Sequence, residues 1–177
     1  MTKEEALTKI KELEEFVKNC DKELKLYDIV NYCNHEWYVI EIFEDKVRLM
    51  SKNVIGTCTY SDNNSNDYAE SNCVKLLNNF ISKLKLSELL TMKVNYDENK
   101  FFVGLISIPT LRDIEALPMN IRRCEKIYWT MTSSYGISED CIDANVFYVY
   151  SDGFLFNDWV SNMYGVRPVI KVRKECL

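Results

Sequence analysis

The chain has 177 residues, of which 47% are hydrophobic and 28% charged, and its formal net charge is −5. This composition is ordinary for one soluble globular domain with a core of its own, and it excludes disordered, collagen-like and porin-like chains. The negative charge argues against nucleic-acid binding, because phosphate recognition needs a cationic surface.

The sequence shows neither a membrane-spanning segment nor an export signal. No apolar run reaches the roughly 18 residues of a spanning helix, and residues 2–16 lack the apolar centre of a secretory signal. We therefore expect no membrane insertion, and a protein that stays in the cytoplasm or is assembled there into something larger. The seven cysteines include no CxxC pair, which favours isolated core thiols without a metal or cofactor.

An amphipathic helix is predicted at residues 2–24. Its apolar positions recur at alternating intervals of four and three residues, and they are Ala6, Ile10, Leu13, Val17, Cys20 and Leu24. This is the spacing of a coiled-coil seam, in which Ile10, Leu13 and Val17 would hold a homo-oligomer or a docked partner. A helix that packs on its own domain is the alternative.

Residues 26–177 are predicted to form one α+β domain behind the helix at 1–25. Strands are expected at 27–33, 36–43, 47–51, 101–108, 127–132, 145–150, 154–160 and 166–172, with helices at 73–84 and 111–117. A polar loop is expected at 61–68. The turn at 151–153 reads Ser-Asp-Gly and indicates a hairpin, because Asp and Gly tolerate positive φ.

Three segments in the second half of the chain carry a resemblance to a known family. They read YWTMTSS at 128–134, ANVFYVYSDGFL at 144–155 and YGVRPVI at 164–170. In this order they resemble the C-terminal half of a family of bacterial and phage proteins with a C-type-lectin-like fold, related to the formylglycine-generating enzyme and to phage tropism determinants. The resemblance spans residues 27–172. It implies a C-type-lectin-like domain of short twisted strands with two or so helices, here preceded by the amphipathic helix.

The resemblance also singles out structural positions, which are Trp129, Gly153, Gly165, Arg167 and Pro168. A side chain at Gly165 would obstruct the bend through which a loop enters a strand. Arg167 can hold loop carbonyls by several hydrogen bonds. Pro168 marks an edge or irregular position, since proline cannot donate to a strand ladder.

Catalytic and metal-binding patterns are not recognisable in the sequence. An enzyme of the formylglycine-generating type needs a reactive cysteine pair, and Cys124 and Cys141 stand at no matching motif position. Residues 157–159 have the residue types of a calcium-dependent lectin site in the wrong order, and the polar loop at 61–68 lacks EF-hand spacing. The one histidine, His35, has no evident catalytic partner. We expect no enzyme and no metal.

Aromatic residues are concentrated toward the C-terminus, where they make up ten of the 37 residues at 128–164, against 12% of the chain. Strand alternation places Phe147 and Val149 on one face and Tyr148 and Tyr150 on the other. One face must be core, and the other is either a second core layer or a Tyr-rich surface for sugar or protein recognition. The candidate ligand-binding residues are Tyr135, Tyr148, Tyr150, Trp159 and Tyr164.

These observations lead to one leading hypothesis of function and two alternatives. The leading hypothesis, which depends on the resemblance, is a non-enzymatic phage or prophage protein displayed on a virion at a tail, baseplate or capsid surface. Its partners would be other virion proteins, host-surface proteins or glycans, with homo-oligomers formed through the N-terminal helix. The alternatives are an enzyme of the formylglycine-generating type, or a degenerate relative, and a cytoplasmic protein-interaction module.

Overall fold

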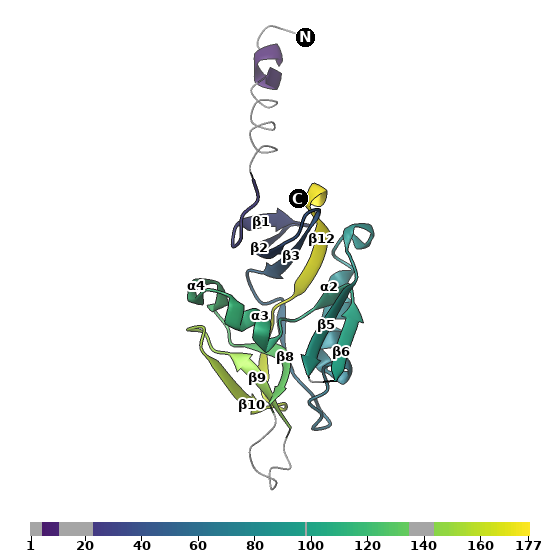
Figure 1. The fold of residues 1–177 in the computed structure, drawn as a ribbon, viewed down its shortest axis with the longest axis vertical. Coiled ribbons are helices and arrows are strands. Elements are labelled where there is room, and N and C mark those ends of the chain that lie inside the picture. Colours follow the sequence, from purple (N-terminus) through teal and green to yellow (C-terminus); the bar gives the residue numbers. More distant parts are fainter. Residues whose placement is uncertain (1–4, 11–22, 98, 135–143) are drawn as a thin grey trace.

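Short β-strands joined by a few short helices form the domain, so the α+β expectation is confirmed (Figure 1). The computed structural model describes residues 5–10, 23–97, 99–134 and 144–177. In these parts the strands form two five-stranded sheets and one two-stranded hairpin.

The first sheet combines strands from both ends of the chain, in the order β1-β2-β3-β12-β7. Its strands are β1 (Ile29–Tyr32), β2 (His35–Ile42), β3 (Lys46–Ser51), β7 (Ile106–Ser107) and β12 (Val169–Arg173). All neighbouring strands in it are antiparallel. A two-residue turn joins β1 to β2 at Cys33 and Asn34, whose φ values of 52° and 61° match the twist of a hairpin.

The second sheet has the order β10-β9-β8-β11-β4. Its strands are β4 (Gly56–Thr59), β8 (Tyr128–Ser134), β9 (Asn145–Val149), β10 (Leu155–Trp159) and β11 (Met163–Val166). The strands β11 and β8 are parallel, and the other pairs are antiparallel. The hairpin predicted around Gly153 joins β9 to β10, and this glycine has a φ of 93°.

Helices and turns connect the strands. They are η1 (Tyr68–Glu70), α2 (Asn72–Ile81), η2 (Leu86–Glu88), α3 (Leu111–Ala116), α4 (Met119–Arg122) and η3 (Lys174–Cys176). The Ser71 side chain caps α2, and Thr110 forms a full capping box with Asp113 at α3. The strands β5 (Met92–Asp97) and β6 (Lys100–Gly104) form the separate hairpin.

The core consists of two clusters, because both sheets bury side chains on both faces. The larger cluster includes Trp37, Leu49, Leu77, Trp129 and Ile170. The smaller cluster contains Met50, Met92, Ile114, Leu117, Ile121, Tyr128, Val149 and Val169. Adjacent residues such as Tyr128 and Trp129 enter different clusters, since successive side chains of a strand point to opposite faces.

The structure corrects the prediction at the C-terminal end. The single strand expected at 166–172 is two strands, β11 and β12, which belong to different sheets. The ladder is interrupted at Arg167 and Pro168 because Pro168 has no N–H to donate, while the Arg167 side chain is fully buried. The strands β4 and β5 have no counterpart in the prediction.

Residues 5–10 are helical, as expected, and Leu7 and Ile10 are each 51% exposed. Leu13 and Val17 lie outside the described residues, so the role of the helix in oligomerisation or docking stays a prediction. The helix predicted to run to residue 24 does not reach it, because residues 23–25 are not helical, and Leu24 instead packs against the larger core cluster.

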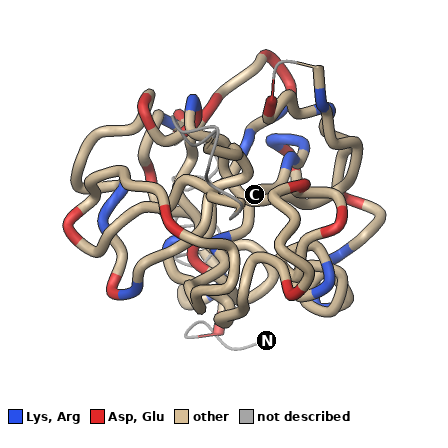
Figure 2. The backbone as a smooth tube through the Cα atoms, turned by 90° about the horizontal axis from the view of Figure 1, so that it is seen from below, with Lys and Arg blue, Asp and Glu red and all other residues tan. Residues whose placement is uncertain are grey.

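Charged residues are distributed around the whole domain. Figure 2 shows acidic and basic positions interspersed along the described backbone rather than gathered on opposite sides. Neither sign of charge therefore dominates one side of the described domain.

Candidate ligand-binding site

Four aromatic side chains lie side by side across one face of the second sheet, and we call them the aromatic row. They are Phe156 on β10, Tyr148 on β9, Trp129 on β8 and Tyr164 on β11. Tyr148 is directly opposite both Phe156 and Trp129 in the strand register. Ring centroids are 6.0 Å apart for Tyr148 and Phe156, 4.8 Å for Tyr148 and Tyr164, and 4.6 Å for Trp129 and Tyr164. These separations are typical of favourable aromatic pairs.

The aromatic row runs from the core to solvent. Trp129 is fully buried, and its indole Nε1 donates to the Cys58 carbonyl at 3.1 Å. Tyr148 and Tyr164 are half-buried, while Phe156 is 51% exposed. Tyr150 extends the exposed end, with its ring 6.3 Å from that of Phe156. The buried tryptophan therefore anchors a set of rings whose outer members are open to a ligand.

A carboxylate stands beside the aromatic row. The Tyr164 hydroxyl donates to Asp158 Oδ2 at 2.5 Å. Burial and this hydrogen bond to a carboxylate raise the pKa of Tyr164 well above its ordinary value. Burial also raises the pKa of Tyr148, and the negative charge of the nearby Asp158 raises it further. Both hydroxyls are thus protonated at neutral pH and combine an apolar ring with a neutral polar group.

A pocket of about 420 Å³ adjoins the aromatic row, and Tyr150 and Tyr164 form part of its wall. The remaining lining comes from Thr57, Glu125, Lys126, Ile127, Ser151, Met163 and Gly165. This volume lies within the range of small-ligand sites, and the lining mixes apolar walls with a few polar groups in the manner such sites require.

The structure brings together some of the candidate ligand-binding residues and separates others. Tyr148, Tyr150 and Tyr164 share one site, whereas Tyr135 lies outside the described residues. Trp159 is 56% exposed and follows Asp158 on β10, so alternation directs it to the opposite face of the sheet.

Two members of the site, Phe156 and Asp158, are absent from the sequence-based candidates. Hairpin register contains the signal for both, because the turn at 151–153 pairs Phe156 with Tyr148 and Asp158 with Val146. Counting outward from this turn would have placed them on the face of Tyr148.

Two of the positions picked out by the resemblance, Arg167 and Gly165, make close contacts in the structure. The buried Arg167 guanidinium donates from Nε to the Ser51 carbonyl at 2.6 Å and from Nη1 to the Ile121 carbonyl at 2.8 Å. Arg167 thus forms several hydrogen bonds to carbonyls, as expected, but the acceptors belong to the end of β3 and to α4 rather than to loops. A Cβ at Gly165 would lie 2.5 Å from Val54 Cγ1 and 2.9 Å from the Ile127 carbonyl oxygen, so a side chain there would be obstructed.

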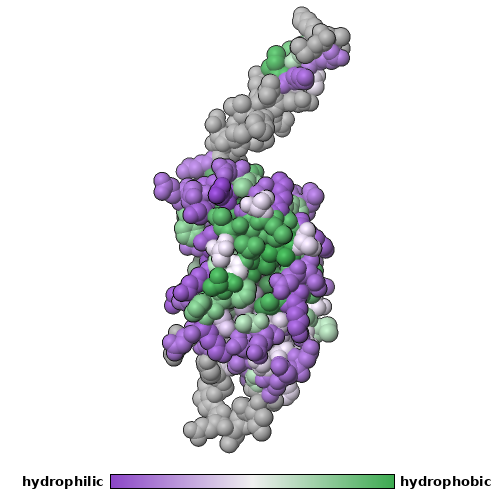
Figure 3. Space-filling model, turned by 90° about the vertical axis from the view of Figure 1, so that its right-hand side faces the viewer, coloured by the Kyte–Doolittle hydropathy of each residue, from purple (hydrophilic) through white to green (hydrophobic). Residues whose placement is uncertain are grey.

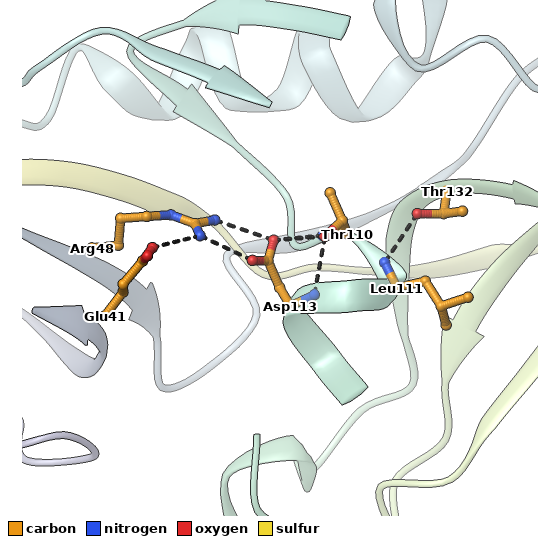
Figure 4. Close-up of polar contacts among 6 residues, drawn as sticks. All are labelled: Glu41, Arg48, Thr110, Leu111, Asp113 and Thr132. Carbon is orange, nitrogen blue, oxygen red and sulfur yellow. Dashed lines mark hydrogen bonds and ion pairs between the residues drawn. The ribbon is translucent and has the colours of Figure 1, made fainter. Parts of the chain in front are cut away.

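A second, more polar pocket of about 530 Å³ contains Arg48, and Figure 4 shows its contacts. The guanidinium donates to both carboxylate oxygens of Asp113, at 2.9 and 3.1 Å, and to Glu41 at 3.0 Å. Burial acts to lower the pKa of Arg48, but the two carboxylates outweigh it and raise that pKa. Asp113 also caps α3 through Thr110. These charged groups pair with one another and connect α3 to β3 of the first sheet. The aromatic row is therefore the better candidate for ligand contact.

A third surface is apolar and belongs to the β5–β6 hairpin. The side of the molecule that carries this hairpin faces the viewer in Figure 3, where apolar residues gather. Phe101 and Val103 on β6 are both more than half exposed, and Lys93 Nζ lies 4.3 Å from the centroid of the Phe101 ring. Neither residue is on the sheet that bears the aromatic row.

The structure describes two of the cysteine and histidine positions weighed for catalysis, Cys124 and His35. Cys124 Sγ lies 4.0 Å from the Lys52 carbonyl, and Cys141 is outside the described residues. The His35 ring packs against Phe80, with centroids 4.9 Å apart. Among the residues that the structure describes, no three His, Cys, Asp or Glu side chains could hold a metal ion together. No helix in the described ranges is long and apolar enough to cross a membrane.

Comparison with known proteins gives no family for this chain. No family model matches the sequence, and the searches of curated proteins and of solved structures found no significant match. What the chain binds is therefore inferred from its residues and their geometry.

Proposed function

We propose that this chain is a non-enzymatic binding module with a C-type-lectin-like fold, which presents the aromatic row and its adjoining pocket to a ligand. The single observation that carries the proposal is the progression from buried Trp129, through half-buried Tyr148 and Tyr164, to exposed Phe156. Core aromatic residues need no such continuation into solvent. Rigid rings offer a large contact area that loses little conformational entropy on binding.

A sugar ring is the ligand class that suits this site best. Its C–H faces can stack on Phe156 and Tyr150, and its hydroxyls can bond with Tyr148, Tyr164 and the Asp158 carboxylate. A host-surface glycan is accordingly the proposed partner, with a host-surface protein as the second choice. The proposed location is a phage or prophage virion, and the order of the three segments at 128–170 is what supports it.

The β10 strand supplies a matched pair of variants for testing the site. Phe156 and Trp159 are exposed to similar extents, 51% and 56%, but alternation puts them on opposite faces of the sheet. On a glycan array, Phe156→Ser should lower binding at least tenfold, whereas Trp159→Ser should leave it unchanged. Loss of binding in the Trp159 variant alone would overturn the site. Failure of the wild-type chain to bind either a glycan on the array or host-cell envelopes would also overturn it.

The proposed location needs a separate experiment. Purified particles induced from a host that carries this gene should contain the chain, as detected by mass spectrometry of washed virions. A chain that is found only in the soluble lysate would refute the virion role and would leave the aromatic row as the site of a cellular interaction module.

A further inference from the structure

Two cysteine side chains from separate elements meet beside the aromatic row, so these two are not the isolated thiols that the sequence favours. Cys58 lies on β4 and Cys73 in the first turn of α2, and their Sγ atoms are 3.8 Å apart. A disulfide requires about 2.0 Å between the sulfurs, so a small side-chain movement would join them. Cys73 is fully buried, whereas Cys58 is partly exposed.

The backbone around both cysteines is fixed, which keeps the thiols adjacent. Leu76 of α2 packs against the open Cα of Gly56 on β4, where an added Cβ would lie 3.3 Å away. Asn72 donates from its side chain to Thr59 Oγ1 at 2.9 Å and from its backbone N–H to the Tyr60 carbonyl at 2.8 Å. Each of these contacts joins the residues next to Cys58 to the residues next to Cys73.

The two thiols differ in reactivity. The contact with Cys73 lowers the pKa of Cys58, although burial opposes this change, and burial raises the pKa of Cys73 well above its ordinary value. Thiolates react with peroxides and thiols do not, and access matters as much as ionisation. Cys58 is therefore the thiol that an oxidant meets first, and Cys73 is the buried thiol placed to react with the product.

We propose that Cys58 and Cys73 are a modification site, an oxidant-sensitive pair that closes into an intramolecular disulfide. A peroxide transfers one oxygen to Cys58, which becomes a sulfenic acid, and the peroxide is reduced to water or an alcohol. Cys73 Sγ then attacks Cys58 Sγ, the S–S bond forms, and the sulfenic hydroxyl leaves with the Cys73 proton as water. The two sulfurs together lose two electrons, which the peroxide accepts.

The disulfide would fix the buried end of the aromatic row. The Cys58 carbonyl accepts the hydrogen bond from Trp129 Nε1, and Cys58 is directly opposite Tyr164 in the strand register. Joining Cys58 to α2 would therefore hold in place the residue that contacts two members of the row, Trp129 and Tyr164. The inference itself depends on the thiol geometry and not on the proposed function.

Peptide mapping of the full chain tests the proposal without any variant. The chain is treated with graded hydrogen peroxide, free thiols are alkylated, and the protein is digested. Trypsin leaves both cysteines in the peptide 53–75, which should become unalkylated and lighter by two hydrogens. Cleavage before Asp62 and Asp67 then gives fragments 53–61, 62–66 and 67–75. The first and third contain one cysteine each and should remain joined until a reductant is added. A peptide 53–75 that stays doubly alkylated at peroxide doses that oxidise Cys124 would overturn the proposal.

Two variants and a thermal melt complete the test. Cys58→Ser should abolish the joined fragments, and Cys124→Ser, which removes another partly buried thiol, should leave them intact. Because the disulfide closes a loop of about 15 residues, peroxide should raise the thermal midpoint of the wild-type chain by roughly 5–10 °C. A midpoint that rises equally in Cys58→Ser would contradict the assignment.

Discussion

Arg167 shows at the scale of a single residue how the two sheets are joined. It is fully buried, and among the described residues it forms no ion pair with a carboxylate. Its charge is held by carbonyl oxygens of Ser51 and Ile121 and by the faces of two tyrosines, Tyr38 and Tyr128. Burial raises the pKa of Tyr128 to about 12 although the guanidinium acts to lower it, so this tyrosine stays neutral.

We predict that Arg167→Lys lowers the free energy of unfolding by about 3 kcal/mol, because an ammonium cannot reach both carbonyls and leaves buried acceptors without a donor. Chemical denaturation measures the loss. Arg123→Lys, at an exposed position, is the control and should cost less than about 0.5 kcal/mol. A loss below about 1 kcal/mol in Arg167→Lys would mean that the carbonyl contacts contribute little.

At the scale of elements, Asp67 connects the polar loop at 61–67 to the β5–β6 hairpin. Its carboxylate accepts from the Tyr96 hydroxyl at 2.8 Å and from Lys100 Nζ at 3.3 Å, and it caps η1 through Ala69 N–H. Burial acts to raise the pKa of Asp67, but these donors outweigh it and lower that pKa below its ordinary value.

A carboxyl with a lowered pKa stabilises the folded state above its unfolded pKa, and this stability is lost as pH falls through the folded pKa. We therefore predict that wild type and Asp67→Asn differ in unfolding free energy by a constant amount from about pH 7 to 5, and that the gap closes below about pH 4. Urea titrations across this range provide the measurement. Tyr96→Phe, which removes one donor, should show part of the effect, and a gap that is as large at pH 3 as at pH 7 would disprove the linkage.

Elements with a local signal were predictable from sequence, and those that depend on distant partners were not. The caps at Ser71 and Thr110 and the turn at Gly153 act within a few residues, and the structure has all three. The strand β5 reads MKVNYD and alternates between apolar and polar residues, so it could have been predicted as a strand. The strand β4 reads GTCT, which is too short and polar to be distinguished from a loop. Pro168 signalled an irregular position, but the separation of β11 and β12 into different sheets is visible only when both sheets are known.

The candidate site follows the same division. Tyr148, Tyr150 and Tyr164 could be selected from aromatic enrichment alone. Their assembly depends on β11 lying parallel to β8, a pairing between strands that are not consecutive in the chain. Composition cannot supply that pairing. Trp159 fails for a different reason, because the register of the hairpin at 151–153 puts it on the face opposite Tyr148.

At the scale of the whole molecule, the N-terminal helix offers a test of assembly. Leu7 and Ile10 are half exposed in the single chain, and full burial of an apolar side chain is worth about 1.5–3 kcal/mol. We predict that Ile10→Asp, like Leu13→Asp, reduces the mass in light scattering to that of one chain and leaves the thermal midpoint of the domain nearly unchanged. Lys9→Glu is the control for charge. A lower midpoint at constant mass would instead mean that the helix packs on its own domain.

The order of strands in the two sheets also constrains how the protein is made. The strand β12 lies between β3 and β7, and β11 lies between β8 and β4. Neither sheet can be completed until residues 163–173 have emerged from the ribosome, and until then β4 and β7 have no neighbour within their sheets. Folding must therefore wait for the end of this segment rather than proceed strand by strand during translation. A chain stalled before residue 163 would expose open strand edges, which favour pairing with other chains and aggregation.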